Sequence, residues 1–126
     1  MGNGTSVGRV RGLGSAHSGS HHWLLQRFTA IGNLVLTSWL AVSLMALPNF
    51  SYITLRDWIV SPVTSTGLAL FVISTFWHAR LGLQVVVEDY VHEAGAKFAA
   101  MTALNLAAFG GAAYGLFSIL RLALGA

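Results

Sequence analysis

The chain has 126 residues, of which 55% are hydrophobic and 9% are charged, and it contains no cysteine. A soluble domain carries about 25% charged residues, so this composition predicts a membrane protein. The lack of cysteine excludes disulfides and thiolate metal sites. The net charge of +3 comes from basic residues that stand singly beside apolar runs, which favours topology signals over a nucleic-acid surface.

Residues 1–22 are rich in glycine and serine and are expected to form a flexible or interfacial segment. No signal-peptide pattern is recognised, because the first apolar run starts late and is too long. His17 and His21 have the i, i+4 spacing of helical metal ligands, and His22 follows them. No carboxylate or thiol accompanies these histidines, so an interfacial role is favoured over a metal site.

Residues 23–126 are predicted to form an all-α membrane anchor with three transmembrane helices. At about 1.5 Å per residue, each apolar run is long enough to cross a hydrocarbon core of about 30 Å. Pro62 suits the first turn of the second helix, and the connection 48–61 is expected to be an interfacial loop. The predicted spans cover about residues 28–47, 62–87 and 98–120.

Small residues recur every four positions along the third span and predict close packing against another helix. They are Ala99, Ala103, Ala107, Gly111 and Gly115.

The distribution of basic residues predicts the orientation of the chain in the membrane. With three spans, the N-terminus and the 88–97 loop share one side, and most of the basic residues lie there. Basic residues favour the cytoplasmic side. We therefore expect a multi-pass protein of the bacterial inner membrane with a cytoplasmic N-terminus and a periplasmic C-terminus. The basic residues are Arg9, Arg11, Arg27, Lys97 and, by snorkelling, Arg80 on the cytoplasmic side, and Arg56 and Arg121 on the other.

His78 lies near the middle of the second span, where an imidazole needs a reason to be present. Three interpretations are open: a hydrogen bond to a neighbouring helix, a proton relay, or an axial haem ligand. The haem ligand is favoured, because imidazole nitrogen suits iron. Since the predicted spans contain no other histidine, bis-histidine ligation would need a second ligand from another chain.

The face of the second span around His78 is unlike a lipid-facing stripe. At about 100° per residue, it combines glycines, a hydroxyl and a carboxylate within about 40° of the histidine. The glycines make room for a flat or bulky group or for another helix. The face comprises Gly67, Phe71, Ser74, Gly82, Val85 and Asp89.

Asp89 and Tyr90 lie about 16–18 Å along the helix from His78, near the membrane surface. A tyrosine hydroxyl can donate to a quinone carbonyl, and an adjacent carboxylate can orient it. From composition alone, an aromatic belt residue beside solvated acids is the favoured interpretation.

Taken together, these residues resemble the hydrophobic membrane-anchor (D) subunits of succinate dehydrogenase, particularly those of alphaproteobacteria. The resemblance rests on His78-Ala79, Gly82, Gln84-Val85 and Asp89-Tyr90, and on Arg27-x-Thr29-Ala30 at the start of the first span.

The resemblance implies site residues for haem b and ubiquinone. His78 would be one axial haem ligand, and the companion cytochrome b556 subunit would supply the second. Tyr90 would hydrogen-bond a ubiquinone carbonyl with the support of Asp89, in a pocket shared with the companion anchor and the iron–sulfur subunit. Arg27 and Arg80 are candidates for haem-propionate or interface contacts.

The implied function is that of the membrane anchor subunit of succinate:ubiquinone oxidoreductase, in electron transfer from succinate to quinone. The chain has no dinucleotide fingerprint and no cysteine. We therefore expect flavin and iron–sulfur clusters only in partner subunits, with the flavoprotein bound through the iron–sulfur subunit. Alternatives are a haem-free structural anchor, a small proton- or ion-conducting protein, and the anchor of a fumarate reductase.

Overall fold

The computed structural model describes residues 19–125. This part of the chain is all-α and has no strand, which confirms the predicted fold class. The predictions for His17 and for the rest of residues 1–18 lie outside the described residues. The helices are α2 (Gly19–Met45), α3 (Tyr52–Val60), α4 (Pro62–Tyr90) and α5 (Ala94–Ala123).

Local sequence signals explain where these helices begin and end. α2 stops at Met45, shortly before Pro48, because proline disfavours helical backbone in the residue before it. α4 starts with Pro62 at its first turn, as predicted, directly after the N-cap residue Ser61. The Ser61 hydroxyl accepts a hydrogen bond from the backbone N–H of Thr64 at 3.4 Å and satisfies one free donor of the first turn.

Three of the helices are long and apolar enough to cross a membrane, and among the described residues they are α2, α4 and α5. They extend beyond the predicted spans because the helical backbone continues into the interfacial layer. α2 already begins at Gly19, so His21 and His22 belong to a helix, and α4 continues through Tyr90. The chain is thus a multi-pass membrane protein by helix length and composition.

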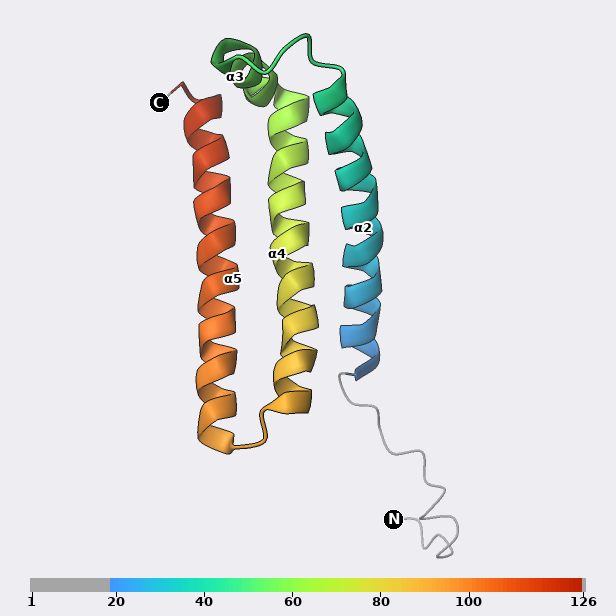
Figure 1. Cartoon of the computed structure of the whole chain (residues 1–126), viewed down its shortest axis with the longest axis vertical. Coiled ribbons are helices and arrows are strands. Elements are labelled where there is room, and N and C mark those ends of the chain that lie inside the picture. Colours follow the sequence, from blue (N-terminus) through green and yellow to red (C-terminus); the bar gives the residue numbers. More distant parts are fainter. Residues whose placement is uncertain (1–18, 126) are drawn as a thin grey trace, which may run out of the picture.

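The three long helices form a single layer with α4 in the middle (Figure 1). α4 packs against both neighbours, whereas α2 and α5 make no close contact within residues 19–125. α2 begins and α5 ends at opposite ends of this layer (Figure 1).

A single layer leaves the described part of the chain almost without a core. Its only buried hydrophobic residues are Leu81, which is 2% exposed, and Ala108, which is 9% exposed. Large side chains such as Phe28 and Phe98 are each 75% exposed. Both faces of the layer therefore need lipid or other protein to cover them.

Glycines let α4 and α5 approach each other closely. A Cβ at Gly111 would collide with the ring of Phe76, and one at Gly115 would lie 3.0 Å from Cγ1 of Val72. The predicted packing role of these two glycines is therefore confirmed. Ala99, Ala103 and Ala107 are exposed in this layer, so their packing against another helix stays a prediction. Residues four apart drift by about 40° per step around a helix, so this row leaves the contact with α4.

The connection predicted as a loop contains the short helix α3, which lies across one end of the layer (Figure 1). Ser51 caps this helix by accepting from the Thr54 N–H at 3.3 Å, and the Thr54 hydroxyl donates to Asn49 Oδ1 at 2.8 Å. The rings of Trp58 and Trp39 stack with centroids 6.4 Å apart, which ties α3 to α2.

Candidate functional site

His78 faces α2 from the middle helix. Its Nδ1 lies 3.1 Å from the hydroxyl oxygen of Thr29. One turn away on α4, the Ser74 hydroxyl donates to the backbone oxygen of Thr29 at 3.4 Å. The approach is close because a Cβ added at Gly32 would lie 3.4 Å from Ser74 Oγ. The pair Thr29–His78 is thus held inside the α2–α4 contact.

The hydrogen bonds of Thr29 favour the tautomer of His78 that carries its proton on Nδ1. The Thr29 hydroxyl has one hydrogen to donate. The backbone oxygens of Leu25 and Gln26 lie 2.9 Å and 3.1 Å from the hydroxyl oxygen. A threonine within a helix donates back to such a carbonyl. Its oxygen then accepts from Nδ1–H of His78. In this tautomer Nε2 keeps its lone pair for a ligand.

The glycines on the His78 face make room for a helix. The indole of Trp39 lies against Gly67, with Cη2 2.6 Å from the position of an added Cβ. Gln26 Nε2 lies 3.5 Å from the corresponding position at Gly82. Of the two occupants expected for this space, α2 is the one observed. Beside the Thr29–His78 pair the two helices leave an open-sided cavity of about 280 Å³, lined by Phe28, Thr29, Gly32, Leu36, Leu70, Ile73, Ser74 and Trp77.

Several buried polar atoms between residues 19 and 125 have no hydrogen-bond partner. Three of them are His22 Nε2, Gln26 Oε1 and Asn33 Oδ1, which lie along α2 on the side that carries Thr29. The fourth is Thr75 Oγ1 on α4. Residues 19–125 contain no group of three metal-binding His, Cys, Asp or Glu side chains.

The inclusion of His22 in α2 corrects one step of the sequence argument. A second helix contributes a histidine, so counting alone no longer places a second haem ligand in another chain. His22 lies about 10 Å along α2 from Thr29, the residue that contacts His78.

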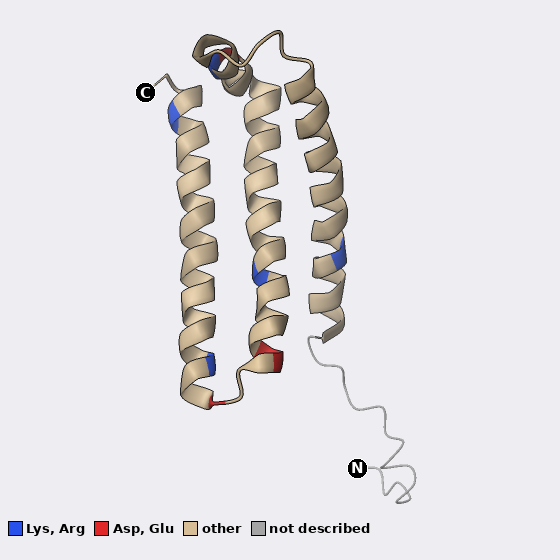
Figure 2. Cartoon of the chain, viewed as in Figure 1, with Lys and Arg blue, Asp and Glu red and all other residues tan. Residues whose placement is uncertain are grey.

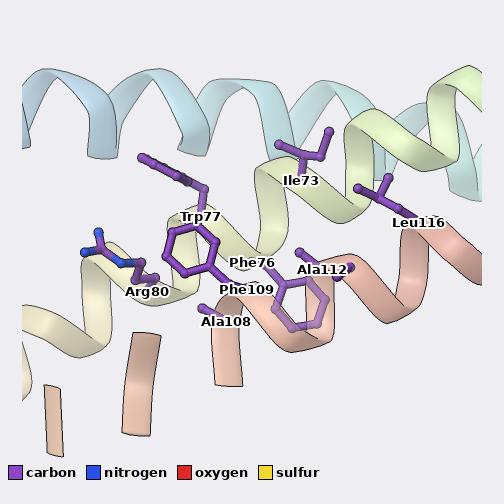
Figure 3. Close-up of a pocket in the computed structure, with 9 residues that line it drawn as sticks. Ile73, Phe76, Trp77, Arg80, Ala108, Phe109, Ala112 and Leu116 are labelled. Atoms are coloured by element: carbon purple, nitrogen blue, oxygen red, sulfur yellow. The ribbon is translucent and has the colours of Figure 1, made fainter. Parts of the chain in front are cut away.

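Arg80 lies on the other side of α4, about 200° around the helix from His78. Its Nε donates to Oδ1 of Asn105 on α5 at 2.6 Å. Its guanidinium carbon lies 5.7 Å from the ring centroid of Trp77 and 6.0 Å from that of Phe109. Figure 3 shows this group at one end of a cavity of about 320 Å³ between α4 and α5. The haem-propionate contact stays a prediction for Arg80.

Arg27 lies on α2, where its guanidinium stacks on Trp23 with the central carbon 4.3 Å from the ring centroid. The side chain is exposed, so it is open to a partner or a lipid headgroup. Its predicted role at a propionate or an interface stays a prediction.

Asp89 and Tyr90 form the last turn of α4, and both are exposed, Tyr90 by 79%. Acidic residues gather at this end of α4 and in the turn that follows (Figure 2). Glu93 caps α5 by accepting from the Gly95 N–H at 2.8 Å and from Ala96. These backbone hydrogen bonds hold the pKa of Glu93 below its ordinary value. The two predicted quinone residues thus lie at an open, polar end of the layer.

Two site residues were not assigned a role from the sequence. Thr29 stands within the Arg27-x-Thr29-Ala30 pattern, which signalled its position but not its contact with His78. Asn105 is the one amide side chain of α5 and carries no signal of its partner, Arg80. A single amide within an apolar span could still have been recognised in the sequence as a candidate partner for an arginine in a neighbouring span.

Comparisons with known proteins point to one family. The profile of the family described as succinate dehydrogenase/fumarate reductase transmembrane subunit matches residues 1–112. A succinate dehydrogenase hydrophobic membrane anchor subunit of Rickettsia bellii is 43% identical over 84 residues, which cover 66% of each chain. The subunit of the same name from Rickettsia conorii is 37% identical over 84 residues, covering 66% of this chain and 67% of that one.

A third relative aligns over most of its length. The succinate dehydrogenase hydrophobic membrane anchor subunit of Paracoccus denitrificans is 29% identical over 118 residues, which cover 93% of this chain and 90% of that one. No solved structure matches the chain. The family profile matches most of the sequence, and the three apolar helices fit its description. This chain therefore belongs to the family of succinate dehydrogenase/fumarate reductase transmembrane subunits.

Proposed function

We propose that this chain anchors a succinate:ubiquinone oxidoreductase in the membrane, supplies one axial ligand of haem b and contributes to the ubiquinone-reduction site. The observation that carries the proposal is the contact of His78 Nδ1 with Thr29, because a hydrogen bond from Nδ1–H leaves the lone pair of Nε2 available to a metal at membrane depth. The family profile covers both succinate dehydrogenases and fumarate reductases, and the names of the relatives favour succinate dehydrogenase.

The residues around His78 fit a haem whose second iron ligand comes from another protein. The chain offers one imidazole nitrogen at this depth, and its hydrogen-bond partner Thr29 lines an open-sided apolar cavity. It closes neither face of the layer, so a second protein must complete the site. A bound haem would accept and release one electron at a time at this point. The second axial ligand is assigned to the companion cytochrome b556 subunit.

Tyr90 and Asp89 are the residues proposed to act on ubiquinone. The Tyr90 hydroxyl donates a hydrogen bond to a quinone carbonyl oxygen, and this bond strengthens as negative charge develops there during reduction. Asp89 orients that hydroxyl or passes a proton towards the oxygen. Both side chains are exposed at the end of α4, which leaves them accessible to quinone and to a soluble subunit.

The soluble chemistry is assigned to partner subunits. An iron–sulfur subunit covers the end of the layer that carries Asp89 and Tyr90, and a flavoprotein that oxidises succinate binds through it. The iron–sulfur clusters are assigned to a partner because this chain has no cysteine, and the flavin because it has no dinucleotide fingerprint. Membrane lipid covers what the companion anchor leaves exposed.

A reduced-minus-oxidised visible spectrum of the purified complex tests the haem assignment. We expect a b-type band in the wild type and in His22→Ala, and no band in His78→Ala. His22→Ala is the matched control, because His22 is a half-buried histidine of α2 whose Nε2 atom is buried. A band that survives in His78→Ala overturns the ligand assignment. A wild-type complex without any band supports the haem-free structural anchor instead.

A further inference from the structure

We propose that Thr29 is a positioning residue for the haem-binding histidine: its hydroxyl accepts from Nδ1–H of His78 and so fixes both the tautomer and the orientation of the imidazole. This inference rests on the proposed function, because it concerns how His78 ligates iron. It assigns a role to a residue on a different helix from the ligand itself.

The first step of the argument is the direction of the hydrogen bond. The Thr29 oxygen lies 2.9 Å from the backbone oxygen of Leu25 and 3.1 Å from Nδ1 of His78. Its single hydrogen goes to the carbonyl, which cannot donate, and its lone pairs face the imidazole. A protonated Nδ1 leaves Nε2 as the only nitrogen able to bind iron.

The second step is that the contact is fixed by the packing of two helices. Ser74 donates to the backbone oxygen of Thr29, so the same residue is held from its main chain as well. Thr29 is 9% exposed, so little room is left for its side chain to turn away. Gly32 allows the two helices to approach at this level. The acceptor is therefore in place before any ligand arrives.

The third step is the effect on iron. A histidine ligand whose other nitrogen donates a hydrogen bond is more basic and more precisely oriented. A more basic axial ligand stabilises the oxidised metal relative to the reduced metal, so the Thr29 contact lowers the haem reduction potential. Loss of such a supporting partner typically weakens metal binding by about 10-fold to 100-fold.

The test compares Thr29→Val, Thr29→Cys and Thr29→Ser in the purified complex. Thr29→Val keeps the shape and removes the acceptor. We expect haem binding to weaken by about tenfold or more and the potential of the remaining haem to rise. Thr29→Cys supplies a weak acceptor and should fall between the two extremes. Thr29→Ser keeps the hydroxyl and should match the wild type.

Ser38→Ala is the matched control: like Thr29, Ser38 lies on α2 and its hydroxyl donates to the carbonyl four residues back, at 2.8 Å, but it stands about 13 Å further along the helix. It should keep wild-type haem content and potential. Haem content per complex and a redox titration followed by the haem absorbance are the readouts, and neither depends on enzyme turnover. If Thr29→Val fails to assemble, the potential measured for Thr29→Cys decides.

Two outcomes overturn different claims. If His78→Ala loses the haem while Thr29→Val and Thr29→Cys keep wild-type content and potential, Thr29 only packs and the inference is wrong. If His78→Ala keeps the haem, the proposed function itself is wrong.

Discussion

At the scale of single residues, the two ionisable groups within the second span, His78 and Arg80, lie on opposite sides of α4. His78 contacts Thr29 on α2, and Arg80 contacts Asn105 on α5. Both are polar groups in an apolar setting, where an unsatisfied donor is costly. Asn105 and the aromatic faces of Trp77 and Phe109 stabilise the guanidinium without an acidic partner. Arg80 therefore has partners within this chain, and its contact with a haem propionate stays a prediction.

Replacement of Tyr90 by phenylalanine tests the quinone proposal at the same scale. Tyr90→Phe removes one donor to a developing charge, so ubiquinone reductase activity should fall by about 10-fold to 100-fold. Succinate oxidation with an artificial soluble acceptor should stay unchanged, because that route bypasses the membrane. Tyr114→Phe, on the far half of α5, is the matched control and should leave both activities intact. An equal loss of both activities in Tyr90→Phe would make Tyr90 structural.

The sequence identifies candidate residues where the reason for their presence is local. A histidine in an apolar run and an acid–tyrosine pair at its end are visible without any structure. Their contacts depend on which residue of the next helix comes level with them, and no pattern within one helix encodes that register. The Thr29–His78 contact, 49 positions apart in sequence, appears only in three dimensions.

At the scale of helices, the packing of α4 against α5 depends on where small residues fall. Two adjacent glycines on α5 differ sharply in their surroundings. A Cβ at Gly111 would overlap the ring of Phe76, whereas a Cβ at Gly110 would meet nothing within 4 Å. The small-residue row was predicted correctly where it includes Gly111 and Gly115. Its alanines Ala99, Ala103 and Ala107 turn away from α4, because a repeat of four does not follow the 3.6-residue turn, and their packing against another helix stays a prediction.

Valine at these two positions gives a matched test of helix packing. We expect Gly111→Val to destabilise the purified complex by about 1–3 kcal/mol, as overpacking of a close contact does. Gly110→Val should change stability little, because its side chain would enter open space. The measurement is thermal unfolding of the complex in detergent. Equal effects of both variants would show that α5 does not use the Gly111 face for packing.

At the scale of the whole molecule, the chain is a layer of helices that crosses the membrane three times within its described part. Length and hydropathy predicted the number of crossings, because the hydrocarbon core imposes a minimum length on each helix. The flat arrangement was not predictable. Helix surfaces that face lipid and those that face protein are both apolar, so the sequence has no periodicity that distinguishes them. α3 was missed for a related reason, because a nine-residue interfacial helix has too few turns to show a clear pattern.

The orientation that the basic residues predict for the layer can be measured directly. Since the chain has no cysteine, single cysteines report the side on which they lie. In intact cells, a membrane-impermeant maleimide should label Leu124→Cys at the end of α5 and spare His92→Cys in the α4–α5 turn. In inside-out vesicles the labelling should reverse. The opposite pattern would place the N-terminus in the periplasm.

The near absence of buried side chains in the described layer also has a consequence for how the protein persists in a cell. With only Leu81 and Ala108 as buried hydrophobic residues, little of the stability of the folded chain arises from contacts that it makes with itself. Its stability is then governed by mass action, since proteins that bind the native layer shift the equilibrium towards it. The abundance of this chain should follow the supply of whatever covers its two faces. Unassembled copies should therefore be degraded by proteases and should not accumulate in the membrane.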